Sequence, residues 1–236
     1  MIWLGIDTSN MPLSVAVVKD DTLLVEWTSS VKITHSVGAM PAVEKALKQA
    51  NLKPSDLDAI AVAEGPGSYT GVRIGVTIAK TLAWTLKIPL VGVSSLEALA
   101  GNGSMFKGLI CPIMDARRQN VFSAIYSNTG DQKLEDGHYA LEDLLAKVSD
   151  MDEDILFVGQ DVAIHWDTIQ SALGDRAVRA PFYQDLPRAS VLIAQAKMKE
   201  IPTKEATHHF VPDYKRITEA EANWREDQKK AGNTHD

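Results

Sequence analysis

Residues 5–18, GIDTSNMPLSVAVV, place an aspartate at the end of one apolar run and begin a second run after a short polar turn. The same arrangement recurs at residues 108–126, GLICPIMDARRQNVFSAIY, where Asp115 takes the position of Asp7. Short apolar runs that are bounded by turn residues are typical of β-strands. The repetition predicts that one supersecondary plan is used twice in the chain.

After these two stretches, the predicted strands and helices follow in the same order in each half of the chain. A third strand is followed by a helix, a strand, a helix, a strand and a helix, which gives β-β-β-α-β-α-β-α in each half. Two α/β lobes of this order resemble the actin-like, sugar-kinase and Hsp70 superfold, although a fold alone does not give an activity. We therefore expect an α/β protein with an N-terminal lobe at 1–105, a C-terminal lobe at 106–216, and a charged tail at 217–236 that is helical and then disordered.

Composition narrows the classes of function. The 236 residues are 45% hydrophobic and carry a net charge of −7, so we expect a globular protein whose surface as a whole repels polyanions such as nucleic acid. Cys111 is the single cysteine, which excludes an internal disulfide and favours a reducing compartment. The N-terminus lacks the basic start of a secretory signal, and no segment has about 18 unbroken apolar residues. We expect a cytoplasmic protein with no membrane contact.

The glycine-rich stretch AEGPGSYTGVRIG, residues 63–75, links a predicted strand to a predicted helix. Its glycines fall as G-x-G-x-x-x-G, one residue too long for the dinucleotide-binding pattern, and no lysine follows Gly71 as a Walker A loop requires. Ser68 lacks the flanking glycines of a nucleophile elbow. One weaker alternative stays open, an anion held by the free amides at the N-terminus of the helix.

A row of small residues runs along that helix at spacings of four: Gly71, Gly75, Ala79 and Ala83. Glycine inside a helix costs about 1 kcal/mol relative to alanine, so two glycines in one helix predict that another element approaches closely. The row can pack on the chain's own sheet or on a helix of a partner protein. Periodicity does not choose between these two alternatives.

Asp7 and Asp115 each end the first strand of a predicted lobe. Two such aspartates suit a magnesium and phosphate site in this fold, and they suit equally well turns in which the carboxylate accepts hydrogen bonds from nearby amides. No two of the six histidines stand four residues apart, the spacing that puts two imidazoles on one helix face for a metal ion. We expect no bound metal.

Four motifs carry a family resemblance: GIDTS with SVAVV, GPGSYTGVRIG, MDARRQNVFSAIY and VPDYKR. Together they resemble the TsaB (YeaZ) family of bacterial threonylcarbamoyladenosine synthesis, from the N-terminus to about residue 216. The resemblance implies a non-catalytic paralogue of TsaD, the enzyme that transfers a threonylcarbamoyl group to an adenosine of tRNA. It also implies TsaD as a heterodimer partner, TsaE as a third subunit, a homodimer in isolation, and tRNA held mainly by TsaD.

The resemblance places the contact with TsaD, and the homodimer contact, on the first-lobe helices. The residues expected at this interface are Val37, Met40, Val43, Leu47, Gly71, Val72, Gly75, Ala79, Leu82 and Ala83. A vestigial phosphate or nucleotide site is expected at Asp7, Thr8, Ser9, Asp115 and Gly159. No tightly bound cofactor is expected, and ATP or ADP would bind at the interface with partners.

Two other functions remain as alternatives. The first is an ATP-dependent phosphotransferase of the actin-like fold that uses Asp7 and Asp115 around Mg-ATP. The second, ranked last, is a peptidase. Basic residues near the end of the chain could contact RNA, although the acidic residues among them favour a solvated helix. These basic residues are Lys215, Arg216, Arg225, Lys229 and Lys230.

Overall fold

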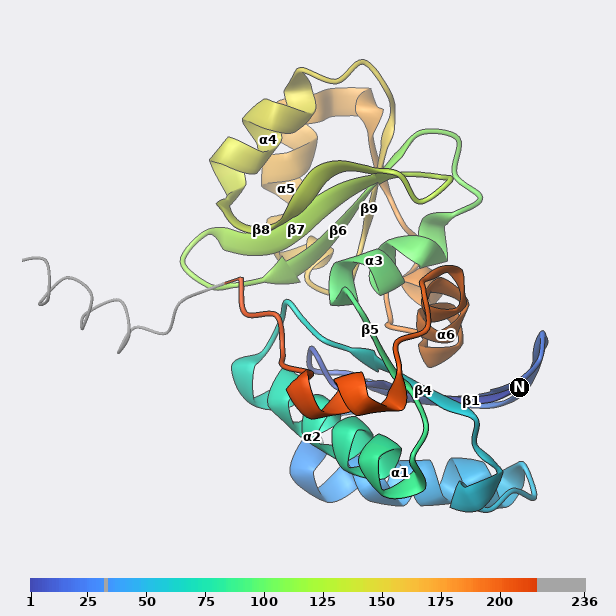
Figure 1. Ribbon diagram of the computed structural model, residues 1–236. Helices are drawn as coiled ribbons and strands as arrows, with labels where there is room; N and C mark the ends of the chain where they lie inside the picture. The colour runs from blue at the N-terminus through green and yellow to red at the C-terminus, as the bar shows by residue number, and fades with distance from the viewer. Residues whose placement is uncertain (32–33, 216–236) are drawn as a thin grey trace, which may run out of the picture.

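The computed structural model of the chain describes residues 1–31 and 34–215, and the predicted tail at 217–236 lies outside the described residues. Figure 1 shows two lobes, each built on one mixed sheet with helices on both faces. The first sheet has the strand order β3-β2-β1-β4-β5 and the second has the order β10-β9-β6-β7-β8. Within 1–31 and 34–215, no helix combines the length and the apolar character that a membrane span needs.

The two sheets repeat one topology. In each, the first strand pairs antiparallel with the second and parallel with the fourth, so the duplicated α/β plan predicted from the sequence is confirmed. The strands of the first sheet are β1 (Ile2–Asp7), β2 (Leu13–Lys19), β3 (Thr22–Ser29), β4 (Ala59–Ala63) and β5 (Leu90–Val93). The strands of the second sheet are β6 (Leu109–Asp115), β7 (Asn120–Ser127), β8 (Gln132–Ala140), β9 (Ile155–Val158) and β10 (Ala177–Arg179).

Helices cover both faces of each sheet, which is why the central strands β1, β4, β6 and β9 are apolar on both sides. On the outside, α1 and α2 pack on the first sheet, and α4 and α5 pack on the second. Between the two sheets lie α3 and α6 (Figure 1). The helices are α1 (His35–Gln49), α2 (Tyr69–Leu86), α3 (Ser95–Ala100), α4 (Leu141–Ser149), α5 (Val162–Leu173) and α6 (Ala189–Met198).

The two inner helices are exchanged between the lobes. Helix α3 follows β5 of the first sheet, but its Leu96 and Leu99 pack in a core with β6 and β7 of the second sheet. Helix α6 follows β10 of the second sheet, but its Leu192 and Ile193 pack on β1, β2, β4 and β5 of the first sheet. A boundary near residue 105 therefore does not separate the two hydrophobic cores, because each core includes a helix from the other half of the chain.

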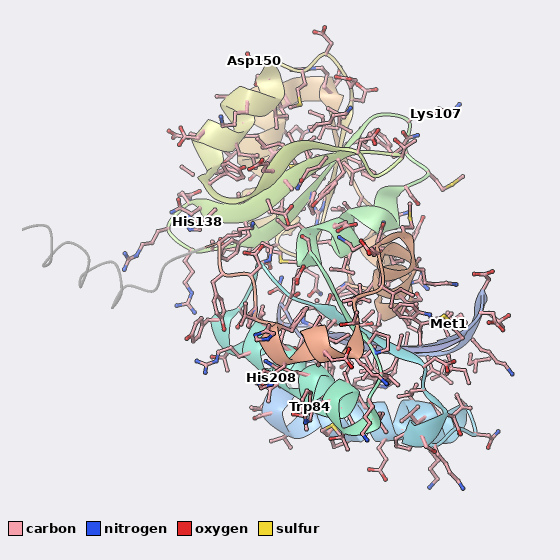
Figure 2. All side chains as sticks on the ribbon, viewed as in Figure 1. Met1, Trp84, Lys107, His138, Asp150 and His208 are labelled. Atoms are coloured by element: carbon pink, nitrogen blue, oxygen red, sulfur yellow. The ribbon has the colours of Figure 1, made fainter. Side chains whose placement is uncertain are left out.

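After α6, the chain stays with the first lobe and crosses α2, as Figure 1 shows for the segment that ends the coloured trace. We call residues 200–215 the C-terminal strap; it contains the 3-10 helix η5 (Lys204–His209). The Lys80 ammonium on α2 donates to the carbonyl oxygens of His208 and Phe210, at 2.8 and 2.9 Å. Trp84 and His208, both labelled in Figure 2, pack with their rings tilted by 43° and the ring centroids 5.5 Å apart.

Candidate functional site

The GPGS turn begins α2 in close contact with the turn that follows β1. The Ser68 amide donates to the Ser9 carbonyl oxygen at 2.7 Å, and the Ser68 hydroxyl accepts from the Gly71 amide at 3.3 Å as the N-cap of the helix. Gly65 has a left-handed φ of 115°, and an ideal Cβ there would lie 2.3 Å from the carbonyl oxygen of Asp213 in the strap. The turn thus touches both the start and the end of the described chain.

The row of small residues on α2 packs on the chain's own turn and sheet. An ideal Cβ on Gly71 would lie 2.2 Å from the Thr8 carbonyl oxygen, and one on Gly75 would lie 2.4 Å from Thr8 Oγ1. Ala79 and Ala83 are fully buried in the first-lobe core. Of the two alternatives left open by periodicity, the structure therefore has the internal one: Gly71, Gly75, Ala79 and Ala83 pack within the first lobe.

The other residues expected at the partner interface divide by burial. Val43 and Leu47 on α1 and Val72 on α2 belong to the same core, so their side chains are buried within the chain, and Leu82 is only partly buried. Val37 and Met40 are exposed, with 71% and 45% of their surface accessible. An apolar face of a helix is normally its buried face, which is why the sequence pattern selected mainly core positions.

Sequence reasoning missed two exposed aromatic residues on α2. Trp84 is 58% exposed and Tyr69 is 46% exposed. The signal was available, since neither residue shares the helix face of the glycines and alanines. Tyr69 packs on Tyr214 of the strap with centroids 4.9 Å apart, and the Arg73 guanidinium lies over the Tyr69 ring.

The turn that contains Asp7 is buried inside the protein. Asp7, Thr8 and Ser9 are all buried, and one carboxylate oxygen of Asp7 accepts from the Ser9 amide at 2.8 Å and the Ser9 hydroxyl at 2.7 Å. The other oxygen, Oδ2, has no hydrogen-bond partner among the described residues. Burial raises the pKa of the Asp7 carboxyl, and the hydrogen bonds from Ser9 only partly offset this rise. Asp7 therefore behaves as the turn-capping alternative describes.

Asp115 occupies a different environment, at the wall of a cavity of about 900 Å³ between the lobes. Its carboxylate accepts from Nε2 of the buried His165 at 3.1 Å, and its amide donates to Asp161 Oδ2 at 2.9 Å. The Asn10 side chain, which also lines the cavity, donates to the same Asp161 oxygen at 3.2 Å and so connects the two lobes. We call this space the inter-lobe cavity.

The five residues expected at a vestigial phosphate site are therefore not brought together around one cavity. Asp115 lines the inter-lobe cavity, whereas Asp7, Thr8 and Ser9 do not. Gly159 serves packing, because an ideal Cβ there would lie 2.4 Å from the Ile113 carbonyl oxygen, and its amide donates to Asp185.

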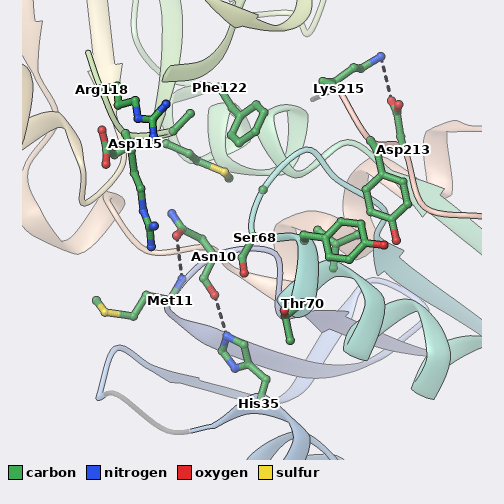
Figure 3. A pocket seen from close by; sticks show the side chains of 17 residues that line it. Asn10, Met11, His35, Ser68, Thr70, Asp115, Arg118, Phe122, Asp213 and Lys215 are labelled. Atoms are coloured by element: carbon green, nitrogen blue, oxygen red, sulfur yellow. Dashed lines mark hydrogen bonds and ion pairs between the residues drawn. The ribbon is translucent and has the colours of Figure 1, made fainter. Parts of the chain in front are cut away.

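The inter-lobe cavity exposes two arginines that sequence reasoning did not select. Arg117 and Arg118 follow Asp115 after one residue, and both line the cavity together with the first turn of α2. Figure 3 shows Arg118 beside Asp115 and across from Ser68 and Thr70. The sequence signal that could have identified them is a pair of adjacent cations close to Asp115. Other lining residues are Met11, Tyr69, Thr70, Met114, Phe122 and Lys215.

A second hollow, of about 550 Å³, has a carboxylate-rich lining. Asp136 on β8 accepts from the Tyr126 hydroxyl at 2.5 Å and from the hydroxyl of Ser94, the N-cap of α3. Glu64 and Glu97 also line it, and burial raises the pKa of Glu64. The hydrogen bond from Ser94 joins the end of β5 and the start of α3 to strand β8 of the second sheet.

The described part of the chain offers little support for a cysteine nucleophile or for a metal site. Cys111 is buried, and burial raises the pKa of its thiol to about 12, so the thiolate form is scarce at neutral pH. Among residues 1–31 and 34–215, no three His, Cys, Asp or Glu side chains gather in a way that could hold a metal ion.

Known proteins resemble this chain over most of its length. A family model described as TsaD, tRNA N6-adenosine threonylcarbamoyltransferase, matches residues 29–224. The tRNA threonylcarbamoyladenosine biosynthesis protein TsaB of Bacillus subtilis is 46% identical over 97% of this chain and 100% of the relative. The TsaB of Escherichia coli is 34% identical over 52% of this chain and 54% of the relative.

A solved structure agrees with these relatives. A Pseudomonas aeruginosa protein, described as uncharacterized with similarity to peptidase YEAZ, is 25% identical and superposes with a TM-score of 0.74. The match covers 91% of this chain and 99% of that protein. On the family model, the near-complete match to the B. subtilis relative and this shared fold, the chain belongs to the TsaB (YeaZ) family, within the wider family that the TsaD model describes.

Proposed function

We propose that this chain is a non-catalytic scaffold and activator subunit of the machinery that makes N6-threonylcarbamoyladenosine in tRNA. In this proposal it binds and stabilises a TsaD-type threonylcarbamoyltransferase, and a TsaE-type subunit joins the complex. The names of its relatives support the pathway. The exposed apolar side chains of α1 and α2 support the partner contact and are the observation on which the proposal depends.

We call these exposed side chains together the helix face: Val37 and Met40 near the start of α1, and Trp84 near the end of α2. The two helices lie side by side on the outside of the first lobe, and the strap lies along the other side of α2 (Figure 1). Large apolar and aromatic side chains that remain in water on neighbouring elements are typical of protein interfaces, and tryptophan is enriched among the residues that dominate binding energy. Through this face the isolated chain would form a homodimer, which TsaD would replace.

The test is co-elution with TsaD. We expect Val37→Glu with Met40→Glu, and separately Trp84→Ala, to weaken the complex by about 30-fold or more, since buried anchors cost about 2 kcal/mol or more when lost. Both changes lie at exposed positions, so the variants should unfold in urea like the wild type. Formation of threonylcarbamoyladenosine in a reconstituted reaction with TsaD and TsaE should fall in parallel.

Ile164→Glu is the matched control, because Ile164 is an equally apolar residue on α5 and is 65% exposed. It should leave the complex and the tRNA modification unchanged. Full co-elution and full modification with all of the helix-face variants would contradict the proposal.

In this proposal, the partner subunits contribute most of the binding of tRNA and of nucleotide. The chain has a net charge of −7, so tRNA would be held mainly by TsaD. No cofactor is bound tightly by the chain alone, and ATP or ADP would bind where the subunits meet. Apart from Lys215, the basic residues considered for RNA contact lie outside the described residues.

The two enzymatic alternatives gain no support from the site. A phosphotransferase would need Asp7 and Asp115 around one Mg-ATP, but Asp7 is buried beneath α2 and does not line the inter-lobe cavity. A peptidase would need an activated nucleophile or a metal, and the single cysteine is buried with a raised thiol pKa.

A further inference from the structure

The C-terminal strap contacts the aromatic residue of the helix face. The ring of His208 in the strap packs on the ring of Trp84 on α2, and both side chains remain exposed to solvent. The contact lies near the end of α2, where Figure 2 labels both residues. The strap therefore meets the surface that the proposed function gives to a partner, and His208 is the residue at which they meet.

The residues on either side of His208 fix its backbone. Thr207 is buried, and Phe210 packs against the first-lobe core. The Lys80 ammonium donates to the carbonyl oxygens of both His208 and Phe210, at 2.8 and 2.9 Å. Hydrogen bonds from a charged donor are stronger than those between neutral groups. His208 is therefore an exposed side chain on a backbone that is tied to α2.

The far end of the strap is tied to α2 as well. The Asp213 amide donates to the Glu64 carbonyl oxygen at 2.7 Å, just before the turn that begins α2. Tyr214 packs on Tyr69 in the first turn of α2, with the ring centroids 4.9 Å apart. The strap thus follows α2 from its last turns back to its first turn, and it is attached along this whole path.

Trp84 without the strap would have more than one orientation. An exposed aromatic side chain on a helix populates several rotamers, and a partner that buries the ring selects one of them at a cost in affinity. Lys80 lies four residues before Trp84, so both residues are on the same side of α2. By binding Lys80, the strap sets the His208 ring against the indole ring and restricts Trp84 before any partner arrives.

We propose that His208 is a positioning residue of the partner interface: the strap fixes the ring of Trp84 in the orientation that a TsaD-type subunit binds. This inference rests on the proposed function, because it takes the helix face to be the surface for that subunit. An ordered side chain raises affinity without adding a contact of its own. The partner surface then consists of three segments, α1, α2 and the strap, and it fits a partner with an apolar pocket for one planar ring.

The test is calorimetry of the full chain with the TsaD-type subunit. His208→Ala should lower the affinity by about threefold to tenfold, the range expected when one side chain must be ordered on binding. His208→Phe keeps a planar ring against the indole and should restore most of the affinity. Both variants should unfold in urea like the wild type, because His208 is exposed. Tyr183→Ala is the control, since it removes an exposed aromatic ring from the second lobe and should leave the affinity unchanged.

A double-mutant cycle shows whether His208 acts through Trp84. In the Trp84→Ala background, His208→Ala should have no further effect on the affinity, because the side chain that it positions is gone. Lys80→Met should lower the affinity by a similar factor, and its effect should not add to that of His208→Ala. In the isolated chain, the indole N–H resonance of Trp84, identified by its loss in Trp84→Phe, should shift in His208→Ala.

The outcomes separate this inference from the proposed function. Wild-type affinity of His208→Ala, together with weakened binding of Trp84→Ala, would overturn the inference and leave the proposed function standing. An equal effect of His208→Ala with and without Trp84 would show a direct contact between His208 and the partner and would also overturn the positioning role. Wild-type affinity of Trp84→Ala and of the Val37→Glu with Met40→Glu variant would overturn both proposals.

Discussion

Thr8 occupies the space that a side chain on Gly75 would need, since an ideal Cβ at Gly75 would lie 2.4 Å from Thr8 Oγ1. The same Thr8 hydroxyl donates to the Gly71 carbonyl oxygen at 2.7 Å. Helix α2 therefore crosses the turn after β1 in direct contact with it, and it can do so because the two helix positions that meet Thr8 are glycines. The glycines of the GPGSYTGVRIG stretch and the DTS turn are two halves of one contact.

Gly75→Ala should destabilise the fold although alanine is the better helix former. Alanine gains about 1 kcal/mol in helix propensity, but overpacking against buried Thr8 costs about 1–3 kcal/mol. We expect a net loss of about 1 kcal/mol in the free energy of unfolding, measured by urea titration. Thr77→Ala at an exposed position of the same helix should change it by less than about 0.5 kcal/mol.

Removing the Thr8 hydroxyl tests the cause of that loss. In the Gly75→Ala background, Thr8→Ala should destabilise less than it does in the wild type, because it also removes the clash. A Gly75→Ala variant more stable than the wild type would contradict the close contact.

Asp7→Asn should change how stability depends on pH. The folded-state pKa of Asp7 is raised above its ordinary value of 3.8, so the folded protein binds the proton more tightly than the unfolded chain does. The wild type therefore loses stability as the pH rises from 3.8 through the raised pKa, whereas neutral asparagine does not titrate. The stability of Asp7→Asn relative to the wild type should rise with pH, measured by urea unfolding at several pH values between about 4 and 7. Parallel profiles for the two proteins would show that Asp7 is not the group responsible.

Lys80→Met should loosen the C-terminal strap selectively. The change removes two charge-assisted hydrogen bonds, to His208 and Phe210, while methionine retains most of the apolar stem. We expect hydrogen exchange to accelerate by about tenfold or more at residues 204–213, since each such bond contributes about 1.5–3 kcal/mol. Amides of β1 and β4 should exchange at the wild-type rate. Equal acceleration in the strap and in these strands would indicate global destabilisation instead of local release.

Ser94→Ala should weaken both a helix and the link between the lobes. The Ser94 hydroxyl caps α3 by accepting from the Leu96 and Glu97 amides, at 3.1 and 3.2 Å, and it donates to Asp136. We expect a loss of about 1–2 kcal/mol in the free energy of unfolding. Because Tyr126 bonds the same carboxylate, Ser94→Ala and Tyr126→Phe should not be additive in urea titrations. Additive effects would show that the two hydrogen bonds contribute independently to the free energy of unfolding, contrary to this prediction.

The order and type of the elements could be predicted because local signals agreed with the fold. Apolar runs ended at Asp7 and Asp115, and Ser94 stood at a capping position, as the structure has them. These signals are carried by neighbouring residues, so they can be read from one sequence.

The candidate site was less predictable because it depends on contacts between distant residues. The glycine row predicted a close approach, but whether Gly75 met a partner or Thr8 depended on a residue 67 positions earlier, which periodicity does not reveal. Likewise, Arg117 and Arg118 gain their place opposite Thr70 only when the two lobes assemble. The exchange of α3 and α6 was also missed, since chain order gives no sign that a helix packs on the other sheet.

That exchange constrains the order in which the chain can fold during its synthesis. The inner face of the first sheet, with Trp3 and Val91, is covered by α6, which lies near the end of the described chain. All five strands of this sheet leave the ribosome long before α6 does, so their apolar inner face stays uncovered in the interval. The nascent first lobe would thus be a client for chaperones until the second lobe has been translated, and a truncated first lobe would be prone to aggregate.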